Sequence, residues 1–238
     1  MKHPPLIMLP ALGADSRLWQ PVIDELGGEF ECTVVRGEGQ TIQAMADHVL
    51  SLAPSEFILV GISMGGYVAL EIALRKTGRV KALALFNTSA IAAPEDRRKN
   101  SESLISLVNS GGFLEAITRT APAVSRGIPE VQRVVEAMTE ELGEQVFVDQ
   151  QRAVMDRSDR RSELASMDCR TLVVGAAEDI ITPPALSEDL AGRLPDARFV
   201  LIQESGHFVP LEQPKAAATA LQAFLRNQAE GSPQVVGR

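Results

Sequence analysis

The stretch that decides the fold reads Phe57-Ile58-Leu59-Val60-Gly61-Ile62-Ser63-Met64-Gly65. Its first four residues are an apolar run that predicts a buried strand, and residues 67–74 have the composition of a helix. Between them stands the pattern G-x-S-x-G, whose glycines let the backbone pass where a Cβ would clash. The same pattern can mark an ordinary turn. Between a strand and a helix, however, it points the serine hydroxyl out of the sheet, so Ser63 is a candidate nucleophile.

A serine hydroxyl is a poor nucleophile at neutral pH and needs a neighbouring base, usually a histidine. The chain contains three histidines, His3, His48 and His207. His3 lies in a proline-flanked N-terminal arm, and His48 lies in a helical stretch upstream of the serine. Only His207 follows a late apolar strand, in the order that this type of site requires. His207 is therefore the predicted base.

The histidine in turn needs an acid that orients its ring. Residues 171–175 predict a buried parallel strand, and Glu178 and Asp179 stand just beyond its end. Sites in open α/β sheets collect beyond the carboxyl ends of the strands. We favour Asp179, the shorter acid directly before an apolar turn, with Glu178 as the alternative. A helix-capping or loop carboxylate is the structural alternative for Asp179.

A developing oxyanion needs two backbone N–H donors. Met64, at the N-terminus of the predicted helix after Ser63, supplies one, because amides at a helix start are unpaired and the helix dipole favours negative charge there. The second is expected from the loop after the first strand, residues 10–15.

The order of apolar and helical segments predicts an α/β fold with a doubly wound, mostly parallel sheet of about six strands flanked by helices. The expected strands are 6–9, 32–35, 57–60, 80–86, 171–174 and 198–202. The expected helices are 16–26, 42–52, 64–76, 184–194 and 212–227. The tail 230–238 is expected to be frayed.

Residues 92–166 show no strand pattern and predict several amphipathic helices inserted into the α/β order. The insertion contains nine arginines, which are most simply solvated helix faces, but one of them could hold a substrate carboxylate. They are Arg97, Arg98, Arg119, Arg126, Arg133, Arg152, Arg157, Arg160 and Arg161. Five apolar side chains could face a pocket or pack against the sheet, namely Leu104, Leu107, Phe113, Met138 and Phe147.

Composition narrows the possible functions. The net charge of −8 argues against a nucleic-acid surface, and no apolar run reaches the ~18 residues of a membrane span. We expect no membrane association, no signal peptide and a cytoplasmic location. Cys32 and Cys169 are expected to be buried packing residues, and two cysteines with three scattered histidines give no metal-ligand spacing. No metal or cofactor is expected, and the oligomeric state stays open.

At this point the chain resembles the α/β-hydrolase superfamily, in its compact, lid-bearing, esterase- and lactonase-like form. Four segments match its pattern, namely 9–19, 61–66, 175–183 and 206–214. The resemblance implies a core domain of residues 1–91 and 167–229, with a lid of residues 92–166 over the active site. It also implies that Leu12 is the second oxyanion donor. The family usually has His-Gly at the start of this loop, where Pro10-Ala11 stand here.

Together these features predict a serine hydrolase that cleaves a small carboxylic ester, lactone or thioester through the catalytic residues Ser63, His207 and Asp179. The stretch 86–90 is similar to enol-lactonases. A carbon–carbon bond hydrolase or a cofactor-free haloperoxidase would use the same residues, and a non-enzymatic small-molecule receptor could retain them. A dehalogenase is disfavoured because it would need Asp in place of Ser63.

Overall fold

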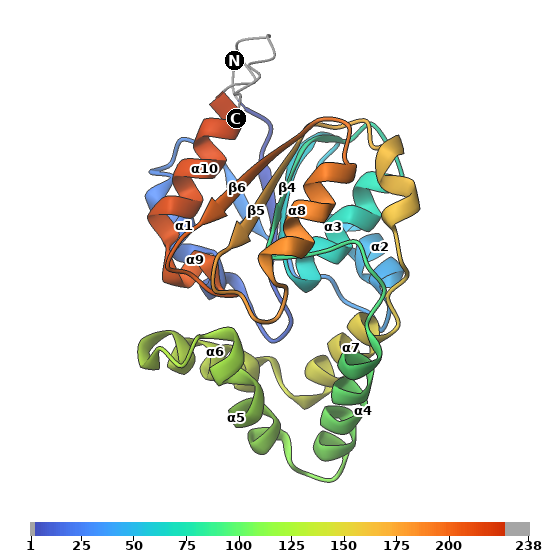
Figure 1. Cartoon of the computed structure of the whole chain (residues 1–238), viewed down its shortest axis with the longest axis vertical. Coiled ribbons are helices and arrows are strands. Elements are labelled where there is room, and N and C mark those ends of the chain that lie inside the picture. The colour runs from blue at the N-terminus through green and yellow to red at the C-terminus, as the bar shows by residue number, and fades with distance from the viewer. Residues whose placement is uncertain (1–2, 227–238) are drawn as a thin grey trace.

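The computed structural model describes residues 3–226, and within them six parallel strands form one sheet. The strand order is β2-β1-β3-β4-β5-β6, which confirms the predicted six-stranded α/β-hydrolase fold (Figure 1). The strands are β1 (Leu6–Leu9), β2 (Cys32–Val34), β3 (Phe57–Ile62), β4 (Val80–Phe86), β5 (Thr171–Ala176) and β6 (Ala197–Ile202).

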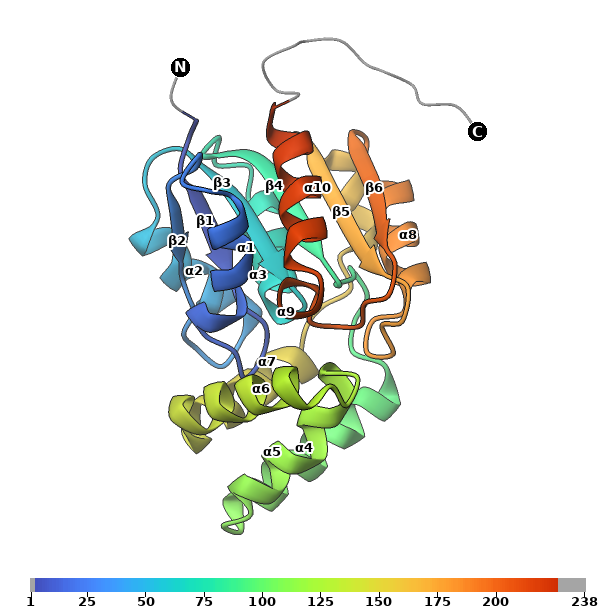
Figure 2. The same cartoon turned by 90° about the vertical axis from the view of Figure 1, so that its left-hand side faces the viewer.

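Helices cover both faces of the sheet because alternate strand residues are apolar on both sides. Leu6 and Met8 of β1 pack into one core cluster, whereas Ile7 and Leu9 pack into the other. Figures 1 and 2 show which helices cover each face. One face carries α1 (Gln20–Glu25), α9 (Val209–Glu212) and α10 (Pro214–Arg226), and the opposite face carries α2 (Ile42–Leu52), α3 (Met64–Leu74) and α8 (Pro184–Arg193).

Several predicted boundaries were wrong by a few residues. The strand before Ser63 continues through Gly61 and Ile62, because these residues pair with Leu85 and Phe86 of β4. The helix expected over 16–26 is divided into a 3-10 turn, η1 (Ser16–Leu18), and α1. The helix expected over 212–227 begins at Pro214 after the short α9. The predicted tail 230–238 lies outside the described residues.

The insertion after β4 is helical, and its helices lie at the carboxyl ends of the strands, where the arrowheads of β5 and β6 point (Figure 1). It contains α4 (Glu95–Asn109), α5 (Phe113–Val124), α6 (Pro129–Leu142), α7 (Glu144–Met155) and η2 (Arg161–Ser166). Leu104 and Phe147 belong to a small apolar core within the insertion, with Leu107 and Phe113 packed against it. Met138 instead joins the core cluster of the sheet. Because the insertion helices lie at the carboxyl ends of the strands, they cover the end of the sheet where the residues that follow the strands are found (Figure 1).

The two cysteines are packing residues. Cys169 is buried and Cys32 is half-buried. Burial raises the pKa of both thiols to about 11, so both stay protonated at neutral pH. Among residues 3–226, no helix combines the length and the apolar character that a membrane crossing requires.

Candidate active site

Ser63 occupies a sharp turn between β3 and α3. Its backbone has φ 53° and ψ −116°, a region that residues with a Cβ rarely adopt. Two hydrogen bonds to neighbouring segments hold the turn, since the Ser63 N–H donates to the Phe86 carbonyl and the Thr88 hydroxyl donates to the Ser63 carbonyl. Strain of this kind persists only where the surrounding structure determines it, and it is concentrated at functional sites.

The structure brings the three predicted side chains together from three strand ends. The Ser63 Oγ lies 2.8 Å from Nε2 of His207, and Nδ1 of the same ring lies 2.8 Å from Oδ2 of Asp179. His207 is 2% exposed and Asp179 is 3% exposed. An ionised carboxylate can only accept hydrogen bonds, so Nδ1 carries the ring proton and the lone pair of Nε2 faces the serine hydroxyl. This is the arrangement that a histidine base requires.

Asp179 is ionised despite its burial. Burial alone would raise the pKa of its carboxyl, but the charge and hydrogen bond of His207 and the hydrogen bonds of Thr182 lower the pKa below its usual range. Oδ1 accepts the backbone N–H groups of Ile181 and Thr182 at 2.8 and 3.0 Å. Both carboxylate oxygens are therefore held, and the acid keeps a fixed direction toward the imidazole.

Two further residues support Asp179, and sequence reasoning did not assign them this role. The Thr182 hydroxyl donates to Oδ2 of Asp179 at 2.7 Å. The Asn87 side chain donates to the same oxygen at 2.8 Å and to the Gly206 carbonyl at 3.1 Å, so it joins the acid to the loop that carries His207. Asn87 has φ 42° and directly follows β4, the neighbour of the serine strand. That strand-end position was the available signal for Asn87.

The alternatives raised by the sequence lie elsewhere. Glu178 is exposed and forms an ion pair with Arg126. Nδ1 of His48 accepts the backbone N–H of Glu38 at 3.2 Å, on the helix upstream of the serine. His3 packs against the ring of Phe30, with 5.0 Å between ring centroids. None of these side chains takes part in the hydrogen-bonded chain of Ser63, His207 and Asp179.

The two predicted oxyanion donors belong to backbone segments that press against each other. Met64 begins α3, so its N–H has no acceptor within that helix. Gly65 sits so close to the end of β1 that a Cβ there would collide with the carbonyl oxygens of Leu9 and Pro10. The turn that carries Leu12 follows at once. The glycine after the elbow thus lets the two donor segments approach each other.

A family model described as "Alpha/beta hydrolase family" matches residues 6–220. The chain belongs to the α/β hydrolase family. It is 28% identical over 250 residues to a protein from Rhizobium rhizogenes that is provisionally named carbamate hydrolase RutD, covering 94% of each chain. It is 24% identical over 249 residues to the pimeloyl-[acyl-carrier protein] methyl ester esterase of Aromatoleum aromaticum, covering 95% of this chain and 100% of that protein.

Solved structures agree with this assignment. A thermophilic esterase from Thermogutta terrifontis, with malate bound, superposes with a TM-score of 0.85 at 26% identity. The superposition covers 95% of this hydrolase and 90% of the esterase. The relatives hydrolyse different bonds according to their names, so the family assignment establishes a hydrolase scaffold and leaves the substrate open.

The arginines of the insertion fall into two groups in this hydrolase. Seven of the nine pair with carboxylates, and these are Arg98, Arg119, Arg126, Arg133, Arg152, Arg160 and Arg161. Arg97 and Arg157 form no ion pair with any residue in 3–226 and donate only to neutral groups. Burial lowers the pKa of Arg97, and the nearby Arg157 charge acts in the same direction.

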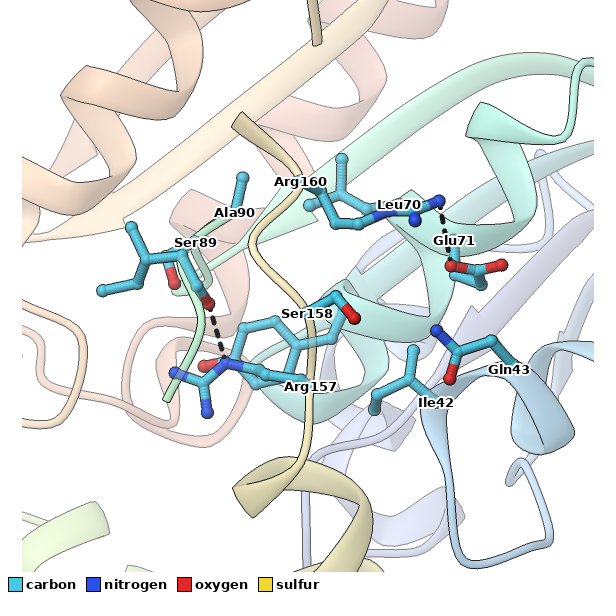
Figure 3. A pocket seen from close by; sticks show the side chains of 11 residues that line it. Ile42, Gln43, Leu70, Glu71, Ser89, Ala90, Arg157, Ser158 and Arg160 are labelled. Atoms are coloured by element: carbon cyan, nitrogen blue, oxygen red, sulfur yellow. Dashed lines mark hydrogen bonds and ion pairs between the residues drawn. The ribbon is translucent and has the colours of Figure 1, made fainter. Parts of the chain in front are cut away.

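A hollow lies where the insertion joins the sheet domain (Figure 3). Its wall is formed by α2, α3, the segment between β4 and α4, and the segment between α7 and η2. The lining residues are Ile42, Gln43, Tyr67, Leu70, Glu71, Ser89, Ala90, Ile91, Arg157, Ser158 and Arg160. The Arg157 guanidinium stacks over the Tyr67 ring at 4.4 Å, and the Tyr67 N–H donates to the Ser63 carbonyl. Ser63 itself is not part of the wall, so the hollow lies beside the serine site.

Proposed function

We propose that this α/β hydrolase cleaves a small carboxylic ester, or the related bond of a lactone or thioester, through an acyl-enzyme on Ser63. The observation that supports the proposal most strongly is the hydrogen-bonded chain from Ser63 through the buried His207 to the buried Asp179, with 2.8 Å at each step. Its geometry matches what a serine nucleophile, a histidine base and an orienting acid need.

The reaction proceeds in two halves. Nε2 of His207 takes the hydroxyl proton while the Ser63 Oγ attacks the carbonyl carbon, and Asp179 stabilises the imidazolium. The backbone N–H groups of Leu12 and Met64 donate to the oxyanion. His207 then protonates the leaving alcohol, which departs and leaves the acyl group on Ser63. Water attacks this ester with His207 as base, releasing the acid and restoring the serine.

Turnover of short p-nitrophenyl esters by the purified chain tests the proposal. Hydrolysis is expected, with an initial burst of p-nitrophenol that approaches the enzyme concentration for esters whose deacylation is slower than their acylation. Stoichiometric release without turnover would identify a receptor that retains the triad. Bromination that depends on halide and peroxide, without ester hydrolysis, would identify a haloperoxidase. Cleavage of a β-diketone or dienone but not of esters would identify a carbon–carbon bond hydrolase.

Carbamate hydrolysis is a second candidate, favoured by the similarity to the protein named carbamate hydrolase RutD. A carbamate carbonyl can be attacked by the same serine and accept the same oxyanion donors. The two candidate functions are distinguished by measuring, side by side, the hydrolysis rates of an ester and of the carbamate that has the same alcohol group. A higher kcat/KM for the carbamate would replace the ester proposal.

We also propose that helices α4 to α7 form a lid that selects the substrate. Leu107 packs against the apolar core of the insertion, which also contacts the side chain of Leu12. Leu107→Ala should reduce kcat/KM more for long acyl chains than for short ones, by about 1–3 kcal/mol at most. Leu114→Ala is the matched control, since Leu114 is 63% exposed on α5. Equal losses for all chain lengths would argue that Leu107 only stabilises the fold.

Arg97 is the best candidate for a contact with a substrate carboxylate. It is half-buried without an acidic partner in residues 3–226, and its Nη1 and Nη2 donate to Ser101 and Gln151. Arg97→Met should lower kcat/KM for p-nitrophenyl esters of dicarboxylic acids by roughly 10–100-fold, the typical value of a charged hydrogen bond. Neutral esters of equal length should change little.

Arg98→Met is the control for this substitution, because Arg98 already pairs with Asp156. A loss of kcat/KM that is the same for charged and neutral esters would show that Arg97 stabilises the insertion and does not bind the substrate carboxylate.

A further inference from the structure

The turn that carries Leu12 is held by the insertion and not only by the sheet domain. The N–H of Gly13 donates to Oε1 of Gln150 on α7 at 2.8 Å. The carbonyl of Gly13 accepts the hydroxyl of Thr139 on α6 at 2.9 Å, and this hydroxyl proton is shared with the Val135 carbonyl of the same helix at 3.0 Å. Gln150 is 1% exposed and Thr139 is 5% exposed. Both backbone groups of the residue after Leu12 are therefore paired with buried side chains from two insertion helices.

The local geometry makes these contacts specific. The Ala14 N–H donates to the Ala11 carbonyl at 3.2 Å, which closes a turn with Leu12 and Gly13 at its centre. Gly13 has φ +70°, as the third residue of a type II turn requires. A Cβ at Gly13 would lie 2.7 Å from the Thr139 hydroxyl, so the helix packs directly on the turn.

Holding Gly13 fixes the direction of the neighbouring donor. The peptide between Leu12 and Gly13 can in principle rotate, because a turn with glycine in third position has alternative conformations. Rotation would break the bond from Gly13 to Gln150 and would change the backbone angles of Leu12. The N–H of Leu12 lies in the preceding peptide, whose Ala11 carbonyl accepts the Ala14 N–H. The Ala14 N–H shares its peptide with the Gly13 carbonyl that Thr139 holds, so these bonds together keep the N–H of Leu12 in one direction.

The Gln150 amide indicates that its contact with Gly13 does more than fill space. Its oxygen must face Gly13, since the N–H there needs an acceptor, so the orientation of the amide is determined. Nε2 is then a buried donor without a hydrogen-bond partner in the described part of the chain. An unpaired buried donor is destabilising. An apolar side chain would fill the same space without an unpaired donor of its own, so it is the bond to Gly13, and not packing, that accounts for a glutamine here.

We propose that Thr139 and Gln150 are positioning residues that orient the oxyanion donor at Leu12, so that the insertion is part of the catalytic apparatus as well as a substrate filter. The inference rests on the proposed serine hydrolase function. It also places a limit on lid motion, because withdrawal of α6 and α7 would release both contacts to Gly13 and disorganise the oxyanion site.

The test compares variants that remove only the hydrogen bonds. Thr139→Val and Gln150→Met approximately keep the side-chain volume. Each should lower kcat by about 10–100-fold, because an oxyanion donor that is misplaced loses most of its stabilising effect on the transition state. KM should change by less than about 3-fold, since this donor acts mainly in the transition state. Thr139→Ser keeps the hydroxyl and should restore most of the rate.

Three further measurements separate positioning from folding. The affinity for a trifluoromethyl ketone, which forms an oxyanion on the serine, should fall in proportion to kcat, and the affinity for the product acid should not. The double variant should lose less than the product of the two single losses, because both residues fix the same turn. Thr120→Val is the matched control, since the Thr120 hydroxyl bonds only to carbonyls of its own helix, α5.

Titration with a fluorophosphonate counts the folded active sites in every variant and corrects kcat for loss of fold. Unchanged kcat in Thr139→Val and Gln150→Met would overturn the inference. Equal losses in Thr139→Val and Thr139→Ser would also overturn it, because the methyl and not the hydroxyl would then matter. A wild-type chain that is not labelled at Ser63 would instead overturn the proposed function.

Discussion

Ser63→Ala should abolish ester turnover, with a fall in kcat of about 10⁶-fold if the residue acts as a triad serine. The reason is geometric. The Ser63 Oγ is the atom that faces Nε2 of His207 at 2.8 Å, and alanine leaves that nitrogen without a hydroxyl to activate. Labelling by a fluorophosphonate should disappear with the activity. Mass spectrometry of the labelled wild-type chain should locate the adduct on the peptide that contains residue 63.

Ser89→Ala is the matched control for this substitution. Ser89 is buried, lies on the loop after β4, and has a hydroxyl with no partner among the described residues. It stands outside the hydrogen-bonded chain to His207, so both activity and labelling should persist. An adduct on Ser89, or full activity in Ser63→Ala, would contradict the assignment of the nucleophile.

The sequence predicted the sheet well because its four central strands, β1, β3, β4 and β5, are largely buried on both faces. A strand of this kind is a nearly continuous apolar run, so the strands at 171–174 and at 80–86, where 82–86 are all apolar, were recognisable without any partner. The strand ends were less certain. Gly61 and Ile62 belong to β3 because they pair with β4, and such pairing between distant segments has no local signal. The predicted helix 16–26 is divided just before Pro21. Proline has no N–H to donate within a helix, so Pro21 is favoured in the first turn of α1.

The three central residues of the site could be predicted for a related reason. Parallel strands end at one edge of the sheet, so a serine, an acid and a histidine that each follow a strand must meet there. The supporting residues could not be predicted in the same way. Thr182 is three residues from Asp179 and looks like an ordinary turn residue. Asn87 reaches the acid across 92 positions of sequence.

The insertion shows this limit most clearly. Its helices were evident from composition, but their contacts depend on how they pack. Nothing near Gln150 in the sequence indicates a bond to Gly13, 137 positions away. Similarly, nine arginines look alike in sequence, and only the fold distinguishes Arg97 and Arg157 from the seven that have acidic partners. Contacts that arise from long-range packing therefore needed the structure.

Asp179→Asn should lower kcat by about 10⁴-fold while the protein stays folded. The two oxygens of Asp179 have different tasks. Oδ1 accepts two backbone N–H groups, and Oδ2 accepts from His207, Asn87 and Thr182. An asparagine has one oxygen, which the fixed backbone donors hold at the Oδ1 position, so its NH₂ group takes the place of Oδ2.

The NH₂ group then faces Nδ1 of His207 and favours the tautomer in which Nδ1 accepts and Nε2 carries the proton. In that tautomer the ring offers Ser63 a donor, so it cannot remove the hydroxyl proton. Circular dichroism and the ligand-free melting temperature check the fold, and kcat for a p-nitrophenyl ester gives the effect. Glu178→Gln is the control and should stay within about 3-fold, because an exposed ion pair such as that of Glu178 with Arg126 contributes little. A severe loss in Glu178→Gln together with a mild one in Asp179→Asn would move the acid to Glu178, and would mean that the buried hydrogen bond from His207 to Asp179 is not the one used in catalysis.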